Sequence, residues 1–367
     1  MTASEDAVAA EARAAGFALV GAAPLGPLER GAFLHAWLAE GRAGEMAYLA
    51  RRTAERIDPR TAFPWARSVI AVGAPYRPPP PPPEDWRATL RGRIAAYAFG
   101  PDYHDGLGDR LAALGRRLAD VFPGRRFLHY VDTGPVLERE WAARAGLGWI
   151  GRNTLLLDRG AGSYLFLGEL FTDLELGAPE PAPDRCGTCV RCHAACPTGA
   201  LGPGYTMDPR RCISYLTIEH RSAIPLDLRP LVGNWIFGCD VCQEVCPWNG
   251  GAASPPTDVL APHLPSLLAL DEAGFRTRYR HTAVARAKRR GLLRNVAVAL
   301  GNSGNPDAVG PLAAALADPE PLVRAHAAWA LGRLGGPGAR RALDAARTRE
   351  PAPRVRDEIA AALATIG

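Results

Sequence analysis

The residues with the clearest chemistry are eight cysteines, all between positions 186 and 246. The first four form a C-x2-C-x2-C-x3-C-P run, the last three form a C-x2-C-x3-C-P run, and one cysteine lies between the runs. In bacterial two-cluster ferredoxins, the first three cysteines of such a run hold one [4Fe-4S] cluster and the fourth holds the other. The spacing therefore predicts two [4Fe-4S] clusters.

The same pattern divides the cysteines into two sets of four. The set predicted for cluster 1 is Cys186, Cys189, Cys192 and Cys246. The set predicted for cluster 2 is Cys196, Cys212, Cys239 and Cys242. Cys212 enters the second set because it is the one thiol that neither run uses. Every cysteine then has a cluster and none is left over.

Zinc and disulfides are the alternative uses of these thiols. Zinc ribbons pair well-separated C-x2-C knuckles, whereas three thiolates on one short loop suit a cluster better. Disulfides need an oxidising compartment. The N-terminus has no apolar signal core, and no segment offers about 20 uninterrupted apolar residues for a membrane span. We therefore expect reduced thiols in a cytoplasmic protein without a membrane association.

Basic residues concentrate in one part of the chain. The formal net charge is +5 over 367 residues, and arginine carries nearly all of the positive charge, because Lys288 is the only lysine. A stretch with interleaved Phe275 and Tyr279 holds seven of the basic residues, which suit the phosphates of a nucleic acid: Arg276, Arg278, Arg280, Lys288, Arg289, Arg290 and Arg294. A solvated helix face is the simpler alternative.

The first 175 or so residues alternate between helical and strand patterns. Apolar runs predict strands near residues 17–21, 68–72, 93–97 and 127–131, and a helical pattern covers 105–118. This order is typical of an α/β or α+β domain with a central sheet. Six prolines at 78–83 can neither continue a helix nor donate to a sheet, so they predict a stiff surface spacer.

The last 75 or so residues contain an internal repeat. Similar stretches begin at residues 292, 323 and 355, about 31 residues apart, and each ends at a glycine. Small alanines lie where neighbouring helices would pack. This pattern predicts stacked helices of a short HEAT-like array, which serves either as a docking surface or as a helical cap.

Several short sequence motifs follow one another along the chain: MAYL at 46–49, RxDPR at 56–60, YAxGxDYH at 97–104, VDTGP at 131–135, AGLGWIGRNT at 145–154, GS at 162–163 and GNWIFGCDVCQ at 233–243. Together with the cysteines and the repeats, they resemble the epoxyqueuosine reductase family over nearly the whole chain. Members of that family are cobalamin-dependent iron-sulfur enzymes that complete the tRNA nucleoside queuosine. No one of the short phrases is specific by itself.

The resemblance implies an α+β fold class in four parts. These are a nitroreductase-like cobalamin-binding domain at 1–177, a bacterial two-cluster ferredoxin-like module at 178–257, a basic connecting segment at 258–291 and HEAT-like α-helical repeats at 292–367. It also implies a monomer that reduces epoxyqueuosine to queuosine in a tRNA anticodon stem-loop. Cob(I)alamin would do the reduction, with electrons from an external low-potential donor passing through the two clusters.

Two other functions remain open at this point. One is a cobalamin and iron-sulfur reductase for a small molecule, as in reductive dehalogenases. The other is an electron carrier without catalysis. The missing export signal and the basic stretch argue against the first, and the first 175 residues would have no purpose in the second.

Asp132 is the predicted proton donor. It follows an apolar strand and precedes a Thr-Gly-Pro turn, and the matching aspartate of the family protonates the substrate. A desolvated carboxyl could keep its proton near neutral pH, although an aspartate at such a place is often only a turn former. The cobalamin contacts that the resemblance implies are Arg56, Tyr97, Tyr103, His104, Asp132, Trp149, Asn153, Ser163 and Gln243.

Overall fold

A computed structural model of the chain describes residues 2–76, 85–250 and 261–366. The chain forms two compact units, each built from separate segments. Unit 1 comprises Met1–Pro78, Pro101–Pro209 and Val241–Ala252, and unit 2 comprises Pro79–Gly100, Arg210–Asp240 and Ala253–Gly367. The proline spacer predicted at 78–83 lies outside the described residues, and the four domain boundaries stay predictions.

Unit 1 is built around one antiparallel sheet with the strand order β1-β2-β7-β4. The four strands of this sheet are β1 (Leu19–Pro24), β2 (Ser68–Pro75), β4 (Phe127–Tyr130) and β7 (Leu165–Thr172). Unit 1 also holds two short strand pairs, β5 (Trp149–Ile150) with β6 (Leu156–Leu157) and β8 (Leu201–Gly202) with β9 (Thr206–Met207). Its α-helices are α1 (Ala3–Ala14), α2 (Gly31–Ala39), α3 (Thr53–Ile57), α5 (Tyr103–Val121), α6 (Glu138–Arg144), α7 (Arg191–Ala195) and α9 (Val241–Glu244). A central sheet is confirmed, with strands near three of the four predicted positions. The strand predicted at 93–97 is wrong, because only Arg93–Ile94 is extended there and it pairs with β10 (Trp235–Phe237) in unit 2, while β7 was not predicted.

Alternating residues of this sheet enter two apolar cores, because successive side chains of a strand point to opposite faces. Ile70 and Leu170 belong to the core that includes residues of α1 and α5. Val69 and Phe171 belong to the core that includes Trp141 of α6. The sheet is therefore covered on both faces. The polar residues described below lie just after β4 and at the starts of α5 and α6.

Unit 2 is mainly helical. Its α-helices are α4 (Trp86–Thr89), α8 (Ile213–Ile218), α10 (Leu264–Leu268), α11 (Glu272–Tyr279), α12 (Lys288–Ser303), α13 (Val309–Ala315), α14 (Pro321–Leu334), α15 (Gly336–Arg347) and α16 (Pro353–Ile366). Its strands β3 (Arg93–Ile94) and β10 (Trp235–Phe237) form a parallel pair. Short 3-10 helices occur in both units: η1 (Ala47–Leu49), η2 (Pro59–Thr61), η3 (Ala96–Ala98), η4 (Pro209–Arg211), η5 (Arg229–Val232), η6 (Pro247–Asn249), η7 (Ala283–Ala287) and η8 (Pro306–Ala308).

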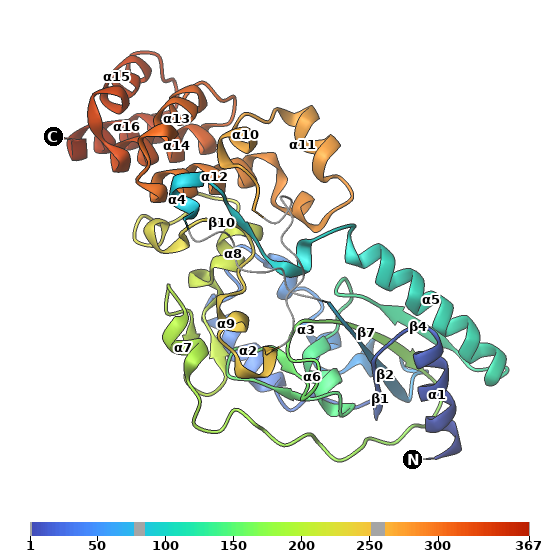
Figure 1. The fold of residues 1–367 in the computed structure, drawn as a ribbon. Helices are drawn as coiled ribbons and strands as arrows, with labels where there is room; N and C mark the ends of the chain where they lie inside the picture. The colour runs from blue at the N-terminus through green and yellow to red at the C-terminus, as the bar shows by residue number, and fades with distance from the viewer. Residues whose placement is uncertain (1, 77–84, 251–260, 367) are drawn as a thin grey trace. The chain divides into compact units, whose positions relative to one another are not determined.

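The predicted repeat corresponds to α12, α14 and α16, which pack in succession (Figure 1). Two glycines allow the close approach. A Cβ at Gly301 would lie 2.8 Å from Ala330, and a Cβ at Gly332 would lie 2.7 Å from the Cβ of Ala362. The first two helices end at glycines with positive φ, which are Gly304 and Gly335, as the repeat predicts. The third predicted glycine lies outside the described residues.

Among the helices in the described part of the chain, none combines the length and apolar character that a membrane crossing requires.

Candidate active site and cluster cavity

Asp132 lies on a loop between β4 and α6, and its backbone is left-handed. Its φ is +55°, which few residues other than glycine adopt, although aspartate and asparagine tolerate it better than most. The Asp132 side chain receives a hydrogen bond of 2.9 Å from the Tyr103 hydroxyl to Oδ2. The Nε2 atom of His104 lies 3.4 Å from the same oxygen. Three predicted site residues therefore meet at one carboxylate oxygen.

His104 is fixed by the start of α5. Asp102 caps this helix by accepting from the backbone N–H of His104, and the same oxygen, Oδ1, lies 2.7 Å from Nδ1 of the imidazole. The hydrogen bond with Asp132 raises the pKa of His104 to about 9 against an opposing effect of burial, with a further contribution from Asp102. His104 is thus protonated at neutral pH.

The sequence predicts that desolvation in a cofactor-covered site keeps a proton on Asp132. The protein chain by itself leaves the Asp132 side chain 55% exposed, so this desolvation would have to come from the cofactor and stays a prediction. The group beside Asp132 that holds a proton at neutral pH is His104, whose raised pKa is described above. Any proton that Asp132 delivers can therefore come from this neighbour.

Two further carboxyls behind Asp132, one half-buried and one fully buried, escaped the sequence analysis. Glu138, the first residue of α6, accepts a hydrogen bond of 2.6 Å from the backbone N–H of Asp132. Glu169, in the middle of β7, is fully buried, and neither of its oxygens has a hydrogen-bond partner among the described residues. A signal was present, because Glu169 is the only charged residue in the apolar strand Leu165–Thr172.

Both glutamates have raised pKa values. Burial, followed by the nearby charge of Asp132, raises the pKa of Glu138 to about 7. Burial also raises the pKa of Glu169 well above its ordinary value, with the charges of Glu138 and Asp132 acting in the same direction. Perturbed carboxyls of this kind gather at functional sites more often than elsewhere.

Arg56 also contacts the loop that carries Asp132. Its Nη1 donates to the backbone oxygen of Gly134 at 3.3 Å, two residues beyond Asp132. Burial lowers the pKa of Arg56. Its Nε is buried without a hydrogen-bond partner in the described part of the chain. Arg56 therefore keeps one free donor atom near the predicted proton donor.

The other predicted cobalamin contacts of unit 1 lie near the cysteines. Ser163 Oγ donates to Oε1 of Gln243 at 2.9 Å, and Asn249 Nδ2 donates to Ser163 Oγ at 2.9 Å. The rings of Trp149 and Trp248 pack edge to face with centroids 5.2 Å apart. Their roles toward cobalamin stay predictions.

Tyr97 belongs to unit 2, unlike the other residues of its predicted set. Its ring lies 6.1 Å from that of Phe237, between centroids. Nearby, the backbone N–H of Ala96 donates to Asp240 Oδ2 at 2.6 Å, which fixes the turn that carries Tyr97. Its cobalamin contact also stays a prediction.

Four of the cysteines line one cavity of about 260 Å³ in unit 1. They are Cys186, Cys189, Cys192 and Cys246, the set predicted for cluster 1. Arg152 and Asn153 also line this cavity, and each has a buried nitrogen without a hydrogen-bond partner among the described residues, Nε in the arginine and Nδ2 in the asparagine. N–H groups turned toward an anionic cluster are a common way to tune it.

The second set of cysteines is divided between the two units. Cys196 and Cys242 belong to unit 1, and Cys212 and Cys239 belong to unit 2. None of the eight cysteines, all of which the structure describes, is in a disulfide. In the described residues, no three Cys, His, Asp or Glu side chains are grouped so that they could hold a single metal ion. The ligand sets stay predictions.

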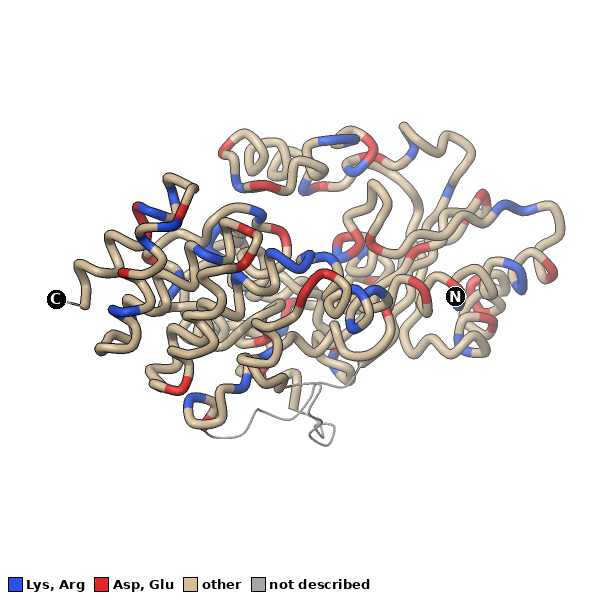
Figure 2. Tube along the Cα trace, turned by 90° about the horizontal axis from the view of Figure 1, so that it is seen from above, with Lys and Arg blue, Asp and Glu red and all other residues tan. Residues whose placement is uncertain are grey.

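The basic stretch divides into exposed and buried residues. Arg276, Arg278 and Arg280, in and next to α11, are exposed, as are Lys288 and Arg290 at the start of α12. Basic and acidic positions are interspersed along the trace (Figure 2), and Arg276, for example, pairs with Glu272 at 3.2 Å. The five exposed residues are available to a phosphate backbone.

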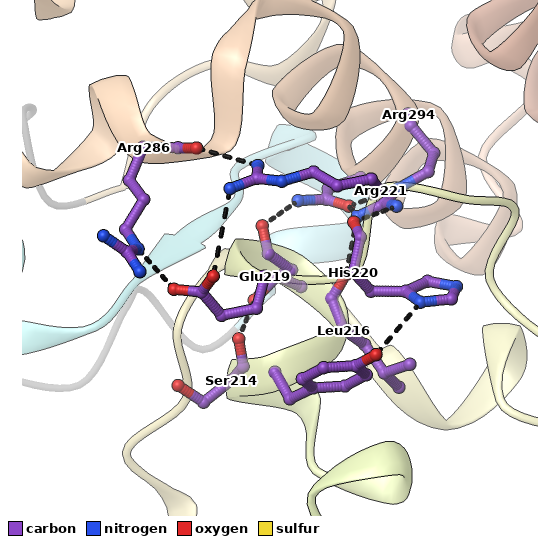
Figure 3. Close-up of polar contacts among 10 residues, drawn as sticks. Ser214, Leu216, Glu219, His220, Arg221, Arg286 and Arg294 are labelled. Carbon is purple, nitrogen blue, oxygen red and sulfur yellow. Dashed lines mark hydrogen bonds and ion pairs between the residues drawn. The ribbon is translucent and has the colours of Figure 1, made fainter. Parts of the chain in front are cut away.

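Arg289 and Arg294 are not available, so their predicted contact with tRNA is wrong. Arg289 is 8% exposed and forms an ion pair with Asp318. Arg294 is fully buried and donates to the backbone oxygens of His220 and Ser222 at 2.7 Å each, as well as to that of Leu216 (Figure 3). These guanidinium groups hold α12 in place and face no solvent.

Fold and site together define a class, an iron-sulfur oxidoreductase with a carboxylate site beside a sheet. Family models match three parts of the chain: a 4Fe-4S double cluster binding domain at 185–249, epoxyqueuosine reductase QueG, DUF1730, at 56–133, and HEAT repeats at 282–364.

Relatives of known name cover most of the chain. It is 43% identical to the epoxyqueuosine reductase of Xanthomonas campestris pv. campestris, over 88% of this chain and 94% of that one. Identity to the epoxyqueuosine reductase of Escherichia coli is 41%, over 81% of each chain. The chain therefore belongs to the epoxyqueuosine reductase family, which confirms the resemblance.

Solved structures agree in fold. A crystal structure of epoxyqueuosine reductase with an epoxyqueuosine-modified tRNA-Tyr stem loop has a TM-score of 0.91 and 28% identity, over 98% of each chain. A structure from Bacillus subtilis, in which the catalytic loop named for its aspartate is swung out of the active site, has a TM-score of 0.90 and 27% identity, over 99% of this chain and 98% of that one. The predicted fold class is confirmed, with its double-cluster domain and HEAT-like repeats.

Proposed function

We propose that the chain reduces epoxyqueuosine to queuosine in the anticodon loop of tRNA, with Asp132 as the proton donor. The observation that carries the proposal is the convergence of Tyr103 and His104 on one oxygen of Asp132, in a member of the epoxyqueuosine reductase family. The small-molecule and electron-carrier alternatives lose support, because the named relatives match over most of this chain.

The residues present fit the cofactors of the family, two [4Fe-4S] clusters and cobalamin. The cavity lined by four cysteines suits one cluster. The corrin ring of cobalamin carries amide side chains whose oxygens accept hydrogen bonds. The buried Nε of Arg56 and Nε1 of Trp149, which have no acceptor among the described residues, are donors of the required kind. When bound, cobalamin supplies the reducing electrons.

The protons come from the chain. Converting an epoxide to an alkene breaks both C–O bonds and releases the oxygen as water, so the reaction consumes two electrons and two protons. Asp132 Oδ2 delivers a proton to the departing oxygen, and the Tyr103 hydroxyl orients that carboxyl. His104, protonated at neutral pH, returns a proton to Asp132 across the 3.4 Å between Nε2 and Oδ2.

Two parts of the tRNA contact the protein. Its phosphate backbone binds exposed basic residues, and the modified base leaves the base stack to enter the active site. Arg276, Arg278, Arg280, Lys288 and Arg290 offer exposed positive charge to the phosphates. An unstacked modified base can enter a pocket where residues act on it directly. An external low-potential electron donor, a monomeric state and a cytoplasmic location complete the proposal.

The test is an anaerobic reaction of the cluster-replete protein with cobalamin, a strong reductant and epoxyqueuosine-bearing tRNA, followed by nucleoside mass analysis. We expect the loss of one oxygen, dependent on added cobalamin. Intact clusters and bound corrinoid without conversion would replace the tRNA with a small-molecule substrate. Failure to bind corrinoid would favour the electron carrier.

A further inference from the structure

The Asp132 loop is held in a conformation that its own residues do not favour. The positive φ of Asp132 places its Cβ near the following carbonyl, a conformation that aspartate tolerates better than most residues but that still costs more than an ordinary backbone. The loop can also take another position in this fold, because the Bacillus subtilis structure has its catalytic loop swung out of the active site. Something must therefore keep Asp132 beside Tyr103 and His104.

Glu138 makes the contact that can do so. Its Oε1 lies 2.6 Å from the backbone nitrogen of Asp132 and accepts that N–H. Glu138 is the first residue of α6, and the residue before it, Leu137, forms no side-chain cap of this helix. The Glu138 side chain instead points back to the loop and binds the Asp132 N–H. The second anchor of the loop is weaker, since Arg56 reaches only the backbone oxygen of Gly134, at 3.3 Å.

Glu169 lies on the same face of the sheet as α6. In β7 it is two residues from Phe171, and side chains two apart in a strand share a face. Phe171 shares a core with Trp141 of α6, and Glu169 itself pairs with Tyr130 at the end of β4. A second carboxyl without a partner among the described residues therefore lies behind the loop, and the nearby charge of Glu138 contributes to its raised pKa.

We propose that Glu138 is a positioning residue, which holds Asp132 in its left-handed conformation beside Tyr103 and His104 by accepting the Asp132 N–H. The inference rests on the proposed function only for its activity readout, because the hydrogen bond itself can be followed without substrate.

The contact depends on pH. An ionised carboxylate is a stronger acceptor than a neutral acid. Since the pKa of Glu138 is raised to about 7, the hydrogen bond strengthens as the pH rises through that value. The charged groups that act on Glu138 are Asp132, Arg139, His104 and Glu169, while β1, β2, β5 and β6, which also pack against α6, bring no titratable side chain.

The first measurement is single-turnover reduction of epoxyqueuosine-bearing tRNA by the holoenzyme between pH 5.5 and 9. Glu138→Ala should lower the rate at least tenfold at pH 8 without changing the KM for tRNA. Glu138→Gln keeps a neutral acceptor, so it should retain part of the rate but lose the inflection near pH 7. Glu140→Gln, on the same helix and away from the loop, is the control.

A second measurement needs no turnover. Hydrogen exchange of the holoenzyme, read by mass spectrometry on a peptide that contains Asp132, should be at least tenfold faster in Glu138→Ala than in the wild type and in Glu140→Gln. An unchanged exchange rate overturns the proposal, as does a wild-type pH profile in Glu138→Gln. If the wild type itself does not turn over, the proposed function fails while the exchange result still decides the role of Glu138.

Discussion

The two units treat buried charge in opposite ways. In unit 2, Arg294 donates to three backbone oxygens and Arg324 forms an ion pair of 2.7 Å with Glu350. In unit 1, Glu169 is equally buried and has no partner among the described residues. Paired buried charges fix a structure, whereas an unpaired one is held at a cost and changes the protonation of its neighbours. Buried charge in unit 2 therefore stabilises the fold, whereas the unpaired carboxyl of unit 1 lies beside the proposed active site.

The largest expected effect is that of Asp132→Asn. Asparagine tolerates the left-handed backbone, so the loop and both cofactors should be retained. The rate should fall by about 10² to 10⁴, which is the usual contribution of a positioned proton donor. Iron content, corrinoid content and single-turnover rate are the measurements. Normal turnover in this variant would remove Asp132 from the chemistry.

Arg294→Ala should act on stability instead. It leaves the backbone oxygens of Leu216, His220 and Ser222 buried without their donor, so the free energy of unfolding should fall by about 3 to 5 kcal/mol. Arg290→Ala, an exposed neighbour on α12, should change it by less than about 0.5 kcal/mol. Chemical denaturation of both variants gives the comparison. Equal effects would mean that burial does not distinguish the two arginines.

Glu169→Leu should make the protein more stable, by about 1 to 3 kcal/mol at pH 8 and by little at pH 5. The raised pKa of Glu169 means that ionisation opposes folding, so its burden is absent below the ordinary glutamate pKa and grows as the pH rises above it. Denaturation at both pH values tests this, with the exposed Glu175→Leu as the control. A pH-independent gain would show that packing rather than charge is responsible.

The smallest expected effect is that of neutralising Arg276, Arg278 and Arg280 together to glutamine. The affinity for tRNA should fall roughly tenfold, and the slope of its dependence on salt should decrease by up to about 2. Both clusters should remain intact. A triple variant of Arg116, Arg117 and Arg125, three exposed arginines of unit 1, has the same change in net charge. Similar losses in the two variants would indicate a general charge effect.

Residue spacing predicted the features that depend on local order. The cysteine runs led to the set that lines one cavity, and the recurring alanines and glycines led to α12, α14 and α16. Spacing alone did not show which side of a helix meets solvent. Arg289 and Arg294 looked like part of a basic surface, but α12 is buried almost all round, and both guanidinium groups turn inward.

The acids of unit 1 were missed for a related reason. Glu169 was missed because the strand that carries it was not predicted, and because only the folded sheet, covered on both faces, shows that its carboxyl is buried. Glu138 looked like an ordinary acid in the first turn of a helix. Its contact with Asp132 requires a backbone turn that no sequence pattern specifies.

The left-handed backbone at Asp132 also restricts what mutation can explore there. Glutamate would keep an acid but is poorly suited to the positive φ, while asparagine and glycine fit the backbone but have no proton to give. Each step away from aspartate loses either the dihedral angle or the acid. No single substitution at this position would therefore keep both the backbone conformation and the acid, although the Asp132 side chain is more than half exposed.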